Sequence, residues 1–408
     1  MKKEVVITGA GIIAPKAYNK NDFWSNLKNG INCIETITKC DTSFLETKIG
    51  GQVFTNDIEI KINKRFLNKC DLFSIYSLLA IEEAIDDAKL SFKDIDKDEI
   101  GLYIGNNSGG WNACSNALHS LHSLREDVSP FLASNWFPAA PQGHSSIYFK
   151  IHGYSKTIAA DMASSTIAIG NAAKLIQEGK MDLMIAGGVE NLINSWGLHF
   201  YESSKTLSKR TDPAMAYLPF DYHRSGLVLA EGACFLILEE REHARNRGAN
   251  IYAELKSFYT NNDGYHYFLG DPHGKEYSNL IKKVLKGERP DYISLNGSAV
   301  KNEDESEING ICNAFDSNLD GISISCPKAF WGNAFGASGA MDTLVSLLSI
   351  QNSLIIKSGF VSAPDIKIKK QFVYNNNLEK NISSALVLNK GFGGINSALF
   401  LKKYKNEN

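Results

Sequence analysis

The stretch ASSTIAIGNAAKLIQE (Ala163–Glu178) carries small and apolar side chains on most sides of a helix. A helix that is apolar nearly all round is buried inside a protein rather than placed on its surface. Gly179 follows directly, and glycine is a typical residue just past the end of a helix. We therefore predict a central, buried helix here and expect the fold to be built around it.

Short apolar runs, typical of strands buried on both faces, alternate with helical stretches along the rest of the chain. The helix predicted over Asp71–Ala88 has apolar residues at three- and four-residue spacing. This alternation predicts an α/β protein. Strands are expected at Val5–Thr8, Ile100–Ile104, Leu183–Ala186, Cys234–Leu238, Ile251–Leu255, Ile293–Leu295, Ala385–Leu388 and Ser397–Leu401.

A chain of 408 residues is too long for one ordinary compact core. The alternation restarts near residue 250, so we expect two core-forming halves, residues 1–250 and 251–408.

The composition is typical of a soluble globular protein, with 43% hydrophobic residues, 22% charged residues and a net charge of −2. The scattered cysteines lead us to expect a cytoplasmic location. This balance favours neither nucleic acid nor an anionic membrane as a partner. No apolar run in the sequence reaches the roughly 18 residues that a membrane span needs. The seven cysteines are scattered without disulfide or zinc spacing, so we expect reduced thiols, no metal and no cofactor.

The pattern Gly9-x-Gly11-x-x-Ala14 follows the first predicted strand and matches the dinucleotide-binding fingerprint. That function requires a helix N-terminus at the phosphates, and Pro15 disfavours helical backbone at Ala14. We therefore predict a tight turn at these glycines and a first helix only over Asp22–Lys28.

Three further glycine-rich segments each come after a predicted strand, and none has the Gly-Lys-Ser/Thr of a phosphate loop. Glycine lets a backbone turn or approach another backbone closely. We expect three turns that bring strand ends together around one site, at Gly105–Gly110, Ala186–Gly188 and Gly391–Gly394.

The segment Phe220–Gly232 places Asp221, Arg224 and Glu231 beside a predicted buried strand. Charged side chains in such a place usually form ion pairs, because an unpaired buried charge is costly. Catalytic acid chemistry is the alternative, and the residues alone leave both open.

Five motifs occur in order along nearly the whole chain. They are Thr8-Gly9-x-Gly11, Ala186–Glu190, Phe220–Gly226 with Glu231-Gly232, Lys328 with Gly332–Gly339, and Gly391–Asn396. Together they resemble the β-ketoacyl-acyl-carrier-protein synthases of the thiolase superfamily. The resemblance implies a five-layered αβαβα fold of two related halves. It also implies a partner, an acyl carrier protein that holds the acyl chain on phosphopantetheine.

The same resemblance shows which residues are missing. An active member has a cysteine at the N-terminus of the central helix, where the helix dipole activates the thiol. This chain has Met162 there, and a thioether cannot form a thioester. Asn296 and Asn333 replace two histidines, whereas Lys328 is retained. Asparagine is neither acid nor base near pH 7, so we expect the chain alone to be inactive.

The segment Ser129–Gly143 is similar to the Trp-Phe…Gly-Gln run of chain-length factors, the inactive β subunits of type II polyketide synthases. Such subunits often carry glutamine at the cysteine position, so Met162 departs from their pattern. The expected function is to pair with an active ketosynthase as a heterodimer and to shape a shared acyl tunnel in an aromatic or aryl-polyene system. The alternatives are a carrier-bound malonyl decarboxylase and a stand-alone module that binds the acyl carrier protein.

The resemblance also places residues at the acyl tunnel. In chain-length factors, the region after the Gly109-Gly110 turn reaches the partner's tunnel and limits product length. The expected tunnel or gate residues are Trp111, Asn116, Leu118, Trp136, Phe137 and Phe392. For Trp111 and Leu118, plain packing in the interface core is an equally open interpretation.

Overall fold

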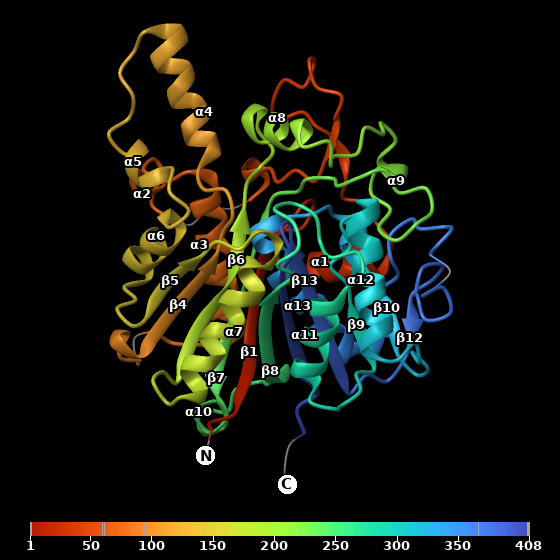
Figure 1. Ribbon diagram of the computed structural model, residues 1–408. Coiled ribbons are helices and arrows are strands. Elements are labelled where there is room, and N and C mark those ends of the chain that lie inside the picture. Colours follow the sequence, from red (N-terminus) through yellow and green to blue (C-terminus); the bar gives the residue numbers. More distant parts are fainter. Residues whose placement is uncertain (1, 59, 61, 93–94, 366, 406–408) are drawn as a thin grey trace.

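The computed structural model describes residues 2–58, 60, 62–92, 95–365 and 367–405 (Figure 1). Its main strands form two five-stranded units. The first has the order β1 (Val5–Ile13), β7 (Gly232–Glu240), β6 (Leu183–Glu190), β4 (Ile100–Gly105) and β5 (Ser155–Ile158). The second has the order β8 (Ala253–Asn262), β14 (Ile395–Lys402), β13 (Ser384–Gly391), β9 (Tyr292–Ser294) and β10 (Ser323–Ser325).

The two units repeat one pattern. In each, the first two neighbouring pairs are antiparallel and the last two are parallel. Corresponding strands also follow the same order along the chain. A short antiparallel pair joins the units, with Val6 opposite Glu254 and Ile7 opposite Ala253. This repeat confirms the prediction of two related halves.

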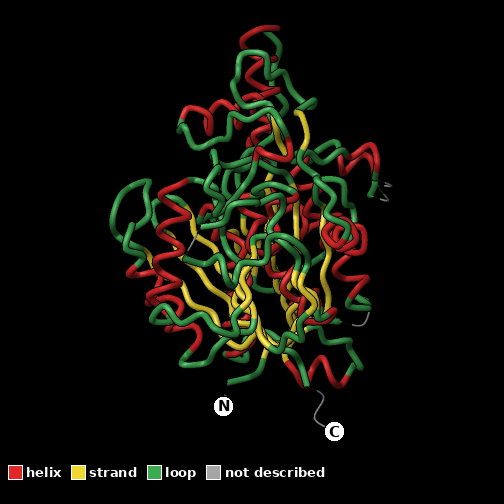
Figure 2. Tube along the Cα trace, turned by 90° about the vertical axis from the view of Figure 1, so that its right-hand side faces the viewer, coloured by secondary structure: helices red, strands yellow, loops and turns green. Residues whose placement is uncertain are grey.

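Helices complete five layers (Figures 1 and 2). In the middle, α7 (Ser164–Gln177) and α13 (Ser338–Asn352) share one hydrophobic core with both strand units. The first unit is covered on its outer face by α3 (Leu72–Asp87). The second is covered by α11 (Lys275–Leu285) and α12 (Lys301–Ala314). The predicted five-layered αβαβα fold and the buried central helix are therefore both confirmed.

Shorter elements connect these layers. They are α1 (Lys20–Lys28), α2 (Lys64–Leu67), α4 (Trp111–His119), α5 (Leu132–Asn135), α6 (Ala140–Phe149), α8 (Ser195–Ser203), α9 (Pro213–Ala216), α10 (Arg241–Asn246), β2 (Glu35–Thr36), β3 (Ile49–Gly50), β11 (Leu354–Ile355) and β12 (Leu378–Glu379). Residue 250, where we predicted the division into halves, lies between α10 and β8. An arm formed by α4 and α5 stands away from the body of the molecule (Figure 1). Within the described ranges, no helix is long and apolar enough to cross a membrane.

The prediction of a tight turn at Gly9 and Gly11 is wrong, because both residues lie inside β1. The helix α3 packs directly on this strand, and a Cβ atom on Gly11 would lie 2.1 Å from the carbonyl oxygen of Ala80. The glycines are thus needed for close packing and not for a change of direction. The strand continues to Ile13, so no helix N-terminus follows the glycines as phosphate binding would require.

The prediction of a turn at Gly187-Gly188 is also wrong, because this pair lies inside β6. A Cβ atom on Gly187 would lie 2.0 Å from the carbonyl oxygen of Cys234 in the adjacent β7. The other two glycine-rich segments do turn after their strands. Gly109 and Gly393 both have φ of +78°, a left-handed backbone that favours glycine.

The charged segment that follows Phe220 makes structural contacts. The buried carboxylate of Glu231 pairs with Lys39 Nζ at 2.6 Å. Arg224 Nε lies 3.6 Å from Asp304 Oδ2 on α12. Asp221 accepts three backbone N–H groups, two at 2.8 Å and one at 2.7 Å. These contacts support the ion-pair interpretation over catalytic acid chemistry.

Glu239 in β7 makes the fold sensitive to acid. Its buried carboxylate accepts hydrogen bonds from Arg247 Nε and from His243 Nδ1, each at 2.8 Å. Burial alone would raise its pKa, but these bonds and one from Thr8 outweigh burial and lower the pKa from 4.5 to about 2. A pKa lowered by folding means stability that is present above pH 4.5 and is lost as the pH falls toward 2.

We expect Glu239→Gln to lower the free energy of unfolding by about 3 kcal/mol at pH 7 and by about 1 kcal/mol at pH 3. Urea unfolding at both pH values measures this difference. The control is Glu242→Gln, on the exposed side of α10, which should change stability by less than about 0.5 kcal/mol. A Glu239→Gln variant as stable as the natural chain at pH 7 would contradict the account.

Candidate functional site

The predicted site lies where the first turns of α7 and α13 meet. Met162 belongs to a 3-10 turn, Asp161–Ala163, that leads into α7. Its side chain is 1% exposed and belongs to an apolar cluster that includes Leu198, Val228 and Phe335. The thioether therefore fills space at the N-terminus of the central helix and is shielded from solvent.

Asn333 stands beside Met162. It follows Gly332, whose φ is +95°, and it precedes the turn that leads into α13. Its Oδ1 accepts hydrogen bonds from Phe335 N and Ser338 Oγ, both at 2.9 Å. Its Nδ2 therefore faces the other way and donates to Met162 Sδ at 2.9 Å. Two of the three degenerate positions are thus in direct contact.

Asn296 is the third degenerate position, and it follows β9. Its backbone N–H and that of Gly297 donate to the two carboxylate oxygens of Glu307 on α12, at 2.8 and 3.0 Å. Tyr217 Oη donates to the carbonyl oxygen of Gly297 at 2.7 Å. Among the atoms that the structure describes, the buried Oδ1 of Asn296 has no hydrogen-bond partner. The loop is thus rigid, with one amide oxygen unsatisfied inside the site.

Lys328, retained from the resemblance, is held in a buried ion pair. Its Nζ lies 2.8 Å from Asp342 Oδ2 on α13, and both side chains are 1% exposed. The same Asp342 oxygen accepts a hydrogen bond from Asn389 Nδ2 in β13 at 2.8 Å. Burial raises the pKa of Asp342, while the ammonium of Lys328 acts in the opposite direction. The pair connects the Lys328 turn, α13 and β13 beneath the site.

This arrangement offers no group suited to acyl transfer. A thioether has no proton to lose, and the two carboxamides neither gain nor lose a proton near pH 7. The ammonium of Lys328 is neutralised by its partner. Cys326 lies nearby in the chain, but burial raises the pKa of its thiol well above the ordinary value, which is the opposite of activation.

Two buried carboxyls near the site were not predicted. Glu190 accepts hydrogen bonds from Asn107 N and Gly336 N, both at 3.1 Å, and burial raises its pKa to about 7. Asp161 Oδ2 accepts the backbone N–H of Phe392 at 2.7 Å, and burial raises its pKa to about 7 as well. Glu190 ends one of the quoted motifs and Asp161 directly precedes Met162, but their partners are distant in sequence and gave no local signal.

The structure separates the six predicted tunnel residues into three groups. Trp111, Trp136 and Phe137 line one apolar cavity of about 580 Å³, together with Cys114, Leu132 and Pro138. Asn116 and Leu118 lie further along α4, outside this lining, with Asn116 exposed. Phe392 is elsewhere, stacked on Phe268 with ring centroids 4.5 Å apart.

Comparisons of this chain with family models and with curated proteins agree with each other. Two family models match adjoining parts of the chain: the β-ketoacyl synthase N-terminal domain over residues 2–244 and the C-terminal domain over residues 252–359. The 3-oxoacyl-[acyl-carrier-protein] synthase 2 of Staphylococcus aureus is 32% identical over 409 residues, which cover 99% of each chain.

Two solved structures are similar over almost the whole chain. One is a type II polyketide synthase acyl-carrier protein in complex with its ketosynthase bound to the hexaketide. The match has 26% identity and a TM-score of 0.89, and it covers 99% of this chain and 100% of that chain. The ishigamide ketosynthase/chain length factor has the same fold, at 22% identity, a TM-score of 0.90 and the same coverage.

The burial of Met162 predicts a large packing effect. We expect Met162→Ala to lower the free energy of unfolding by about 2–5 kcal/mol, because it opens a cavity and leaves Asn333 Nδ2 without an acceptor. Met162→Leu restores most of the volume but also removes the acceptor, so it should cost less than Met162→Ala without being neutral. Met215→Ala, at a partly exposed methionine of α9, is the matched control and should lose much less. Equal losses at Met162 and Met215, measured by urea unfolding, would show that Met162 does not fill the site.

Proposed function

We propose, from the premise that the chain belongs to the β-ketoacyl synthase family, that it acts as a chain-length factor of a type II polyketide synthase. In this role it performs no condensation of its own. It pairs with an active ketosynthase and shapes the acyl tunnel for an aromatic or aryl-polyene product. The proposal rests above all on the contact between Asn333 Nδ2 and Met162 Sδ, at the positions where the resemblance leads us to expect a histidine and the nucleophilic cysteine.

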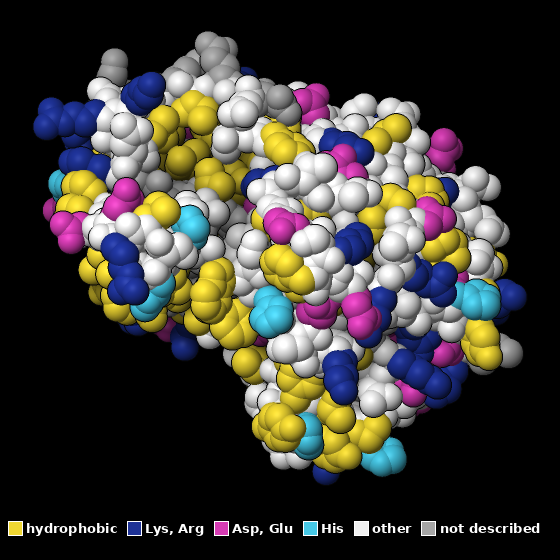
Figure 3. All heavy atoms as spheres, turned by 90° about the horizontal axis from the view of Figure 1, so that it is seen from above, with side chains coloured by type: hydrophobic (Ala, Val, Ile, Leu, Met, Phe, Trp, Pro, Cys, Tyr) yellow, Lys and Arg dark blue, Asp and Glu magenta, His cyan; other side chains and the backbone are white. Residues whose placement is uncertain are grey.

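The surface supports a partner. Strand β5 is the last strand of its unit, so one of its edges carries backbone groups that are free to pair with another chain. Large apolar side chains are exposed on the arm: Leu121, Leu124, Phe131, Trp136 and Phe137. Seen from above, hydrophobic side chains gather on the side of the arm, where the surface is hollowed (Figure 3). An exposed apolar surface of this kind is typical of a protein–protein interface.

An acyl carrier protein is the second proposed partner. The solved complex of an acyl-carrier protein with its ketosynthase supports it, because that match is 26% identical to this chain. The acyl chain would arrive on the carrier's phosphopantetheine and would be elongated by the active ketosynthase.

The alternative of a carrier-bound malonyl decarboxylase has less support. Decarboxylation needs preorganised hydrogen-bond donors aimed at the developing enolate charge. Asn333 Nδ2 already donates to Met162 Sδ, and Lys328 already pairs with Asp342. Neither group is available to a substrate in this arrangement.

The first test of the proposal is the chain alone. Incubated with acylated carrier protein, it should carry no covalent acyl group by intact-protein mass spectrometry. Met162→Cys should not restore condensation with a malonyl carrier, because Asn296 and Asn333 still supply no imidazole. An active ketosynthase subunit, treated in parallel, is the positive control for both assays.

Turnover by Met162→Cys alone, or an acyl adduct on the natural chain, would contradict the proposal. Co-purification with a ketosynthase subunit tests the partner. A stable homodimer that binds no ketosynthase would instead favour the stand-alone carrier-binding module.

The second test concerns product length. Trp111 lines the apolar cavity beside the arm, so Trp111→Ala should lengthen the product of the reconstituted pair while the pair stays assembled. Trp196→Ala is the matched control, because Trp196 contacts Phe200, as Trp111 does, but lies outside the cavity lining. Leu118→Ala tests the outward part of α4 separately. If Trp111 is interface core instead, its truncation lowers the yield of all products and weakens assembly, and only the natural length is made.

A further inference from the structure

Two segments meet beside the apolar cluster that contains Met162: the loop 263–271 and the turn 391–394, here called the entrance loops. Phe268 of the loop stacks on Phe392 of the turn, with the rings 10° from parallel. Gly393 N donates to the carbonyl oxygen of Phe268 at 2.9 Å, and Asp263 N donates to that of Gly394 at 2.9 Å. The loop also carries Tyr267, which is 91% exposed.

Phe392 connects the exposed loop with the apolar cluster that contains Met162. It stacks on Phe268 of the loop and packs against the cluster, which also contains Phe335. A ligand that enters the cluster between the two segments must separate this stack.

Asp161 fixes the inner side of the turn. It has φ of +53°, an uncommon backbone for a residue other than glycine. In this conformation its Oδ2 accepts the N–H of Phe392 at 2.7 Å. The turn comes so close that a Cβ atom on Gly391 would lie 2.8 Å from the Cβ of Asp161. The residue before Met162 therefore holds the backbone of the aromatic residue that packs against the cluster containing Met162.

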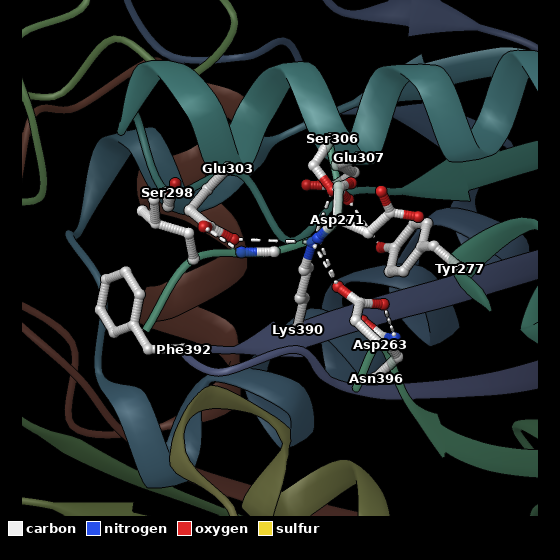
Figure 4. Close-up of polar contacts among 12 residues, drawn as sticks. Asp263, Asp271, Tyr277, Ser298, Glu303, Ser306, Glu307, Lys390, Phe392 and Asn396 are labelled. Atoms are coloured by element: carbon white, nitrogen blue, oxygen red, sulfur yellow. Dashed lines mark hydrogen bonds and ion pairs between the residues drawn. The ribbon is translucent and has the colours of Figure 1, made fainter. Parts of the chain in front are cut away.

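Lys390 fixes the outer side, and it points into a buried cluster of acidic and polar groups (Figure 4). Its Nζ lies 3.3 Å from Asp263 Oδ2 and 3.6 Å from Glu303 Oε2, and the side chain is 2% exposed. It also donates to Ser306 Oγ on α12 at 2.7 Å. One ammonium group thus binds the first residue of the entrance loop and the helix beneath it.

The two carboxylates bind the loop backbone in turn. Glu303 Oε1 accepts Gly270 N at 2.7 Å, and Asp263 Oδ2 accepts Asp271 N at 3.0 Å. Opening the loop would separate Asp263 from Lys390 and Gly270 N from Glu303, leaving Glu303 as the remaining carboxylate partner of Lys390. Breaking a buried pair in this way is strongly unfavourable, since each charge has already lost its hydration.

We infer that Asp161 and Lys390 are positioning residues that hold the entrance loops closed over Met162, so that a pantetheine-linked acyl chain does not enter the centre of this subunit. The inference rests on the proposed function, because a closed entrance suits a subunit that leaves the chemistry to its partner. It adds that the subunit excludes the substrate physically and does not merely fail to react with it.

The test uses a thiol placed at the closed position. In the full-length chain carrying Met162→Cys, alkylation by chloroacetyl-pantetheine is followed by peptide mass spectrometry, which separates the introduced thiol from the seven natural cysteines. Adding Lys390→Met, which keeps most of the length of the unbranched side chain and removes its charge, should raise the alkylation rate at least tenfold. Adding Asp161→Ala should raise it in the same direction.

Two reference variants complete the design. Phe392→Ala removes the stack itself and reports the rate with an open entrance. Lys380→Met is the matched control, because Lys380 is another partly buried lysine of this half that binds the carbonyl oxygen of Asp291, away from the entrance loops. It should change the rate less than twofold.

A Met162→Cys chain that reacts as fast as its Phe392→Ala derivative has an open entrance, which would overturn the inference. The inference would also be overturned if Phe392→Ala raises the alkylation rate but neither Lys390→Met nor Asp161→Ala does. If Lys390→Met fails to fold, as judged by thermal unfolding, Asp161→Ala decides alone, since it removes one hydrogen bond. None of these rates involves a partner or a condensation, so the chain-length-factor proposal stands or falls separately.

Discussion

Gly339, in the first turn of α13, is so close to α7 that a Cβ atom on it would lie 1.9 Å from Thr166 Oγ1. A hydrogen bond of 3.0 Å between the first turns of the two helices adds to this contact. Because the helices share one layer between the strand units, the segments that lead into them must lie side by side. Met162 and Asn333 are therefore neighbours for reasons of packing, whatever their chemistry.

This constraint sets the shape of the site independently of the reactivity of its side chains. Met162 and Asn333 satisfy each other, one as a weak acceptor and one as a donor. The Lys328–Asp342 pair is different, because removal of one partner would leave a bare charge in the interior. Replacing the neutral pair should therefore cost less stability than removing one partner of the ion pair beneath it.

The sequence predicted those features that appear as a repeated pattern along the chain or as apolar residues on one side of a helix or strand. The central helix and the strands followed from the composition and spacing of apolar residues. The assignment of Met162, Asn296 and Asn333 as degenerate positions comes from a family resemblance and stays a prediction. The Gly9 and Gly11 prediction failed because a local pattern shows that a side chain must be absent, not whether a turn or a packed helix requires it. Asp161 and Lys390 were missed because their partners lie far along the chain. Asp161 binds the backbone of Phe392, in the turn before β14, and Lys390 binds Ser306 on α12.

The closed entrance and the open cavity bear on the same question, which is where a growing acyl chain runs. Charged groups that are buried and paired resist separation, because the hydration that they would regain does not offset the loss of the ion pair. Exposed apolar surface has the opposite tendency, since each Å² removed from water contributes about 25 cal/mol. Near Met162 this chain has buried, paired charges, whereas around Trp111 and Trp136 it has exposed apolar surface. The apolar cavity at the arm is therefore the surface at which the proposed partner and its acyl chain would gain most from contact with this subunit, whereas the paired charges near its own centre oppose entry there.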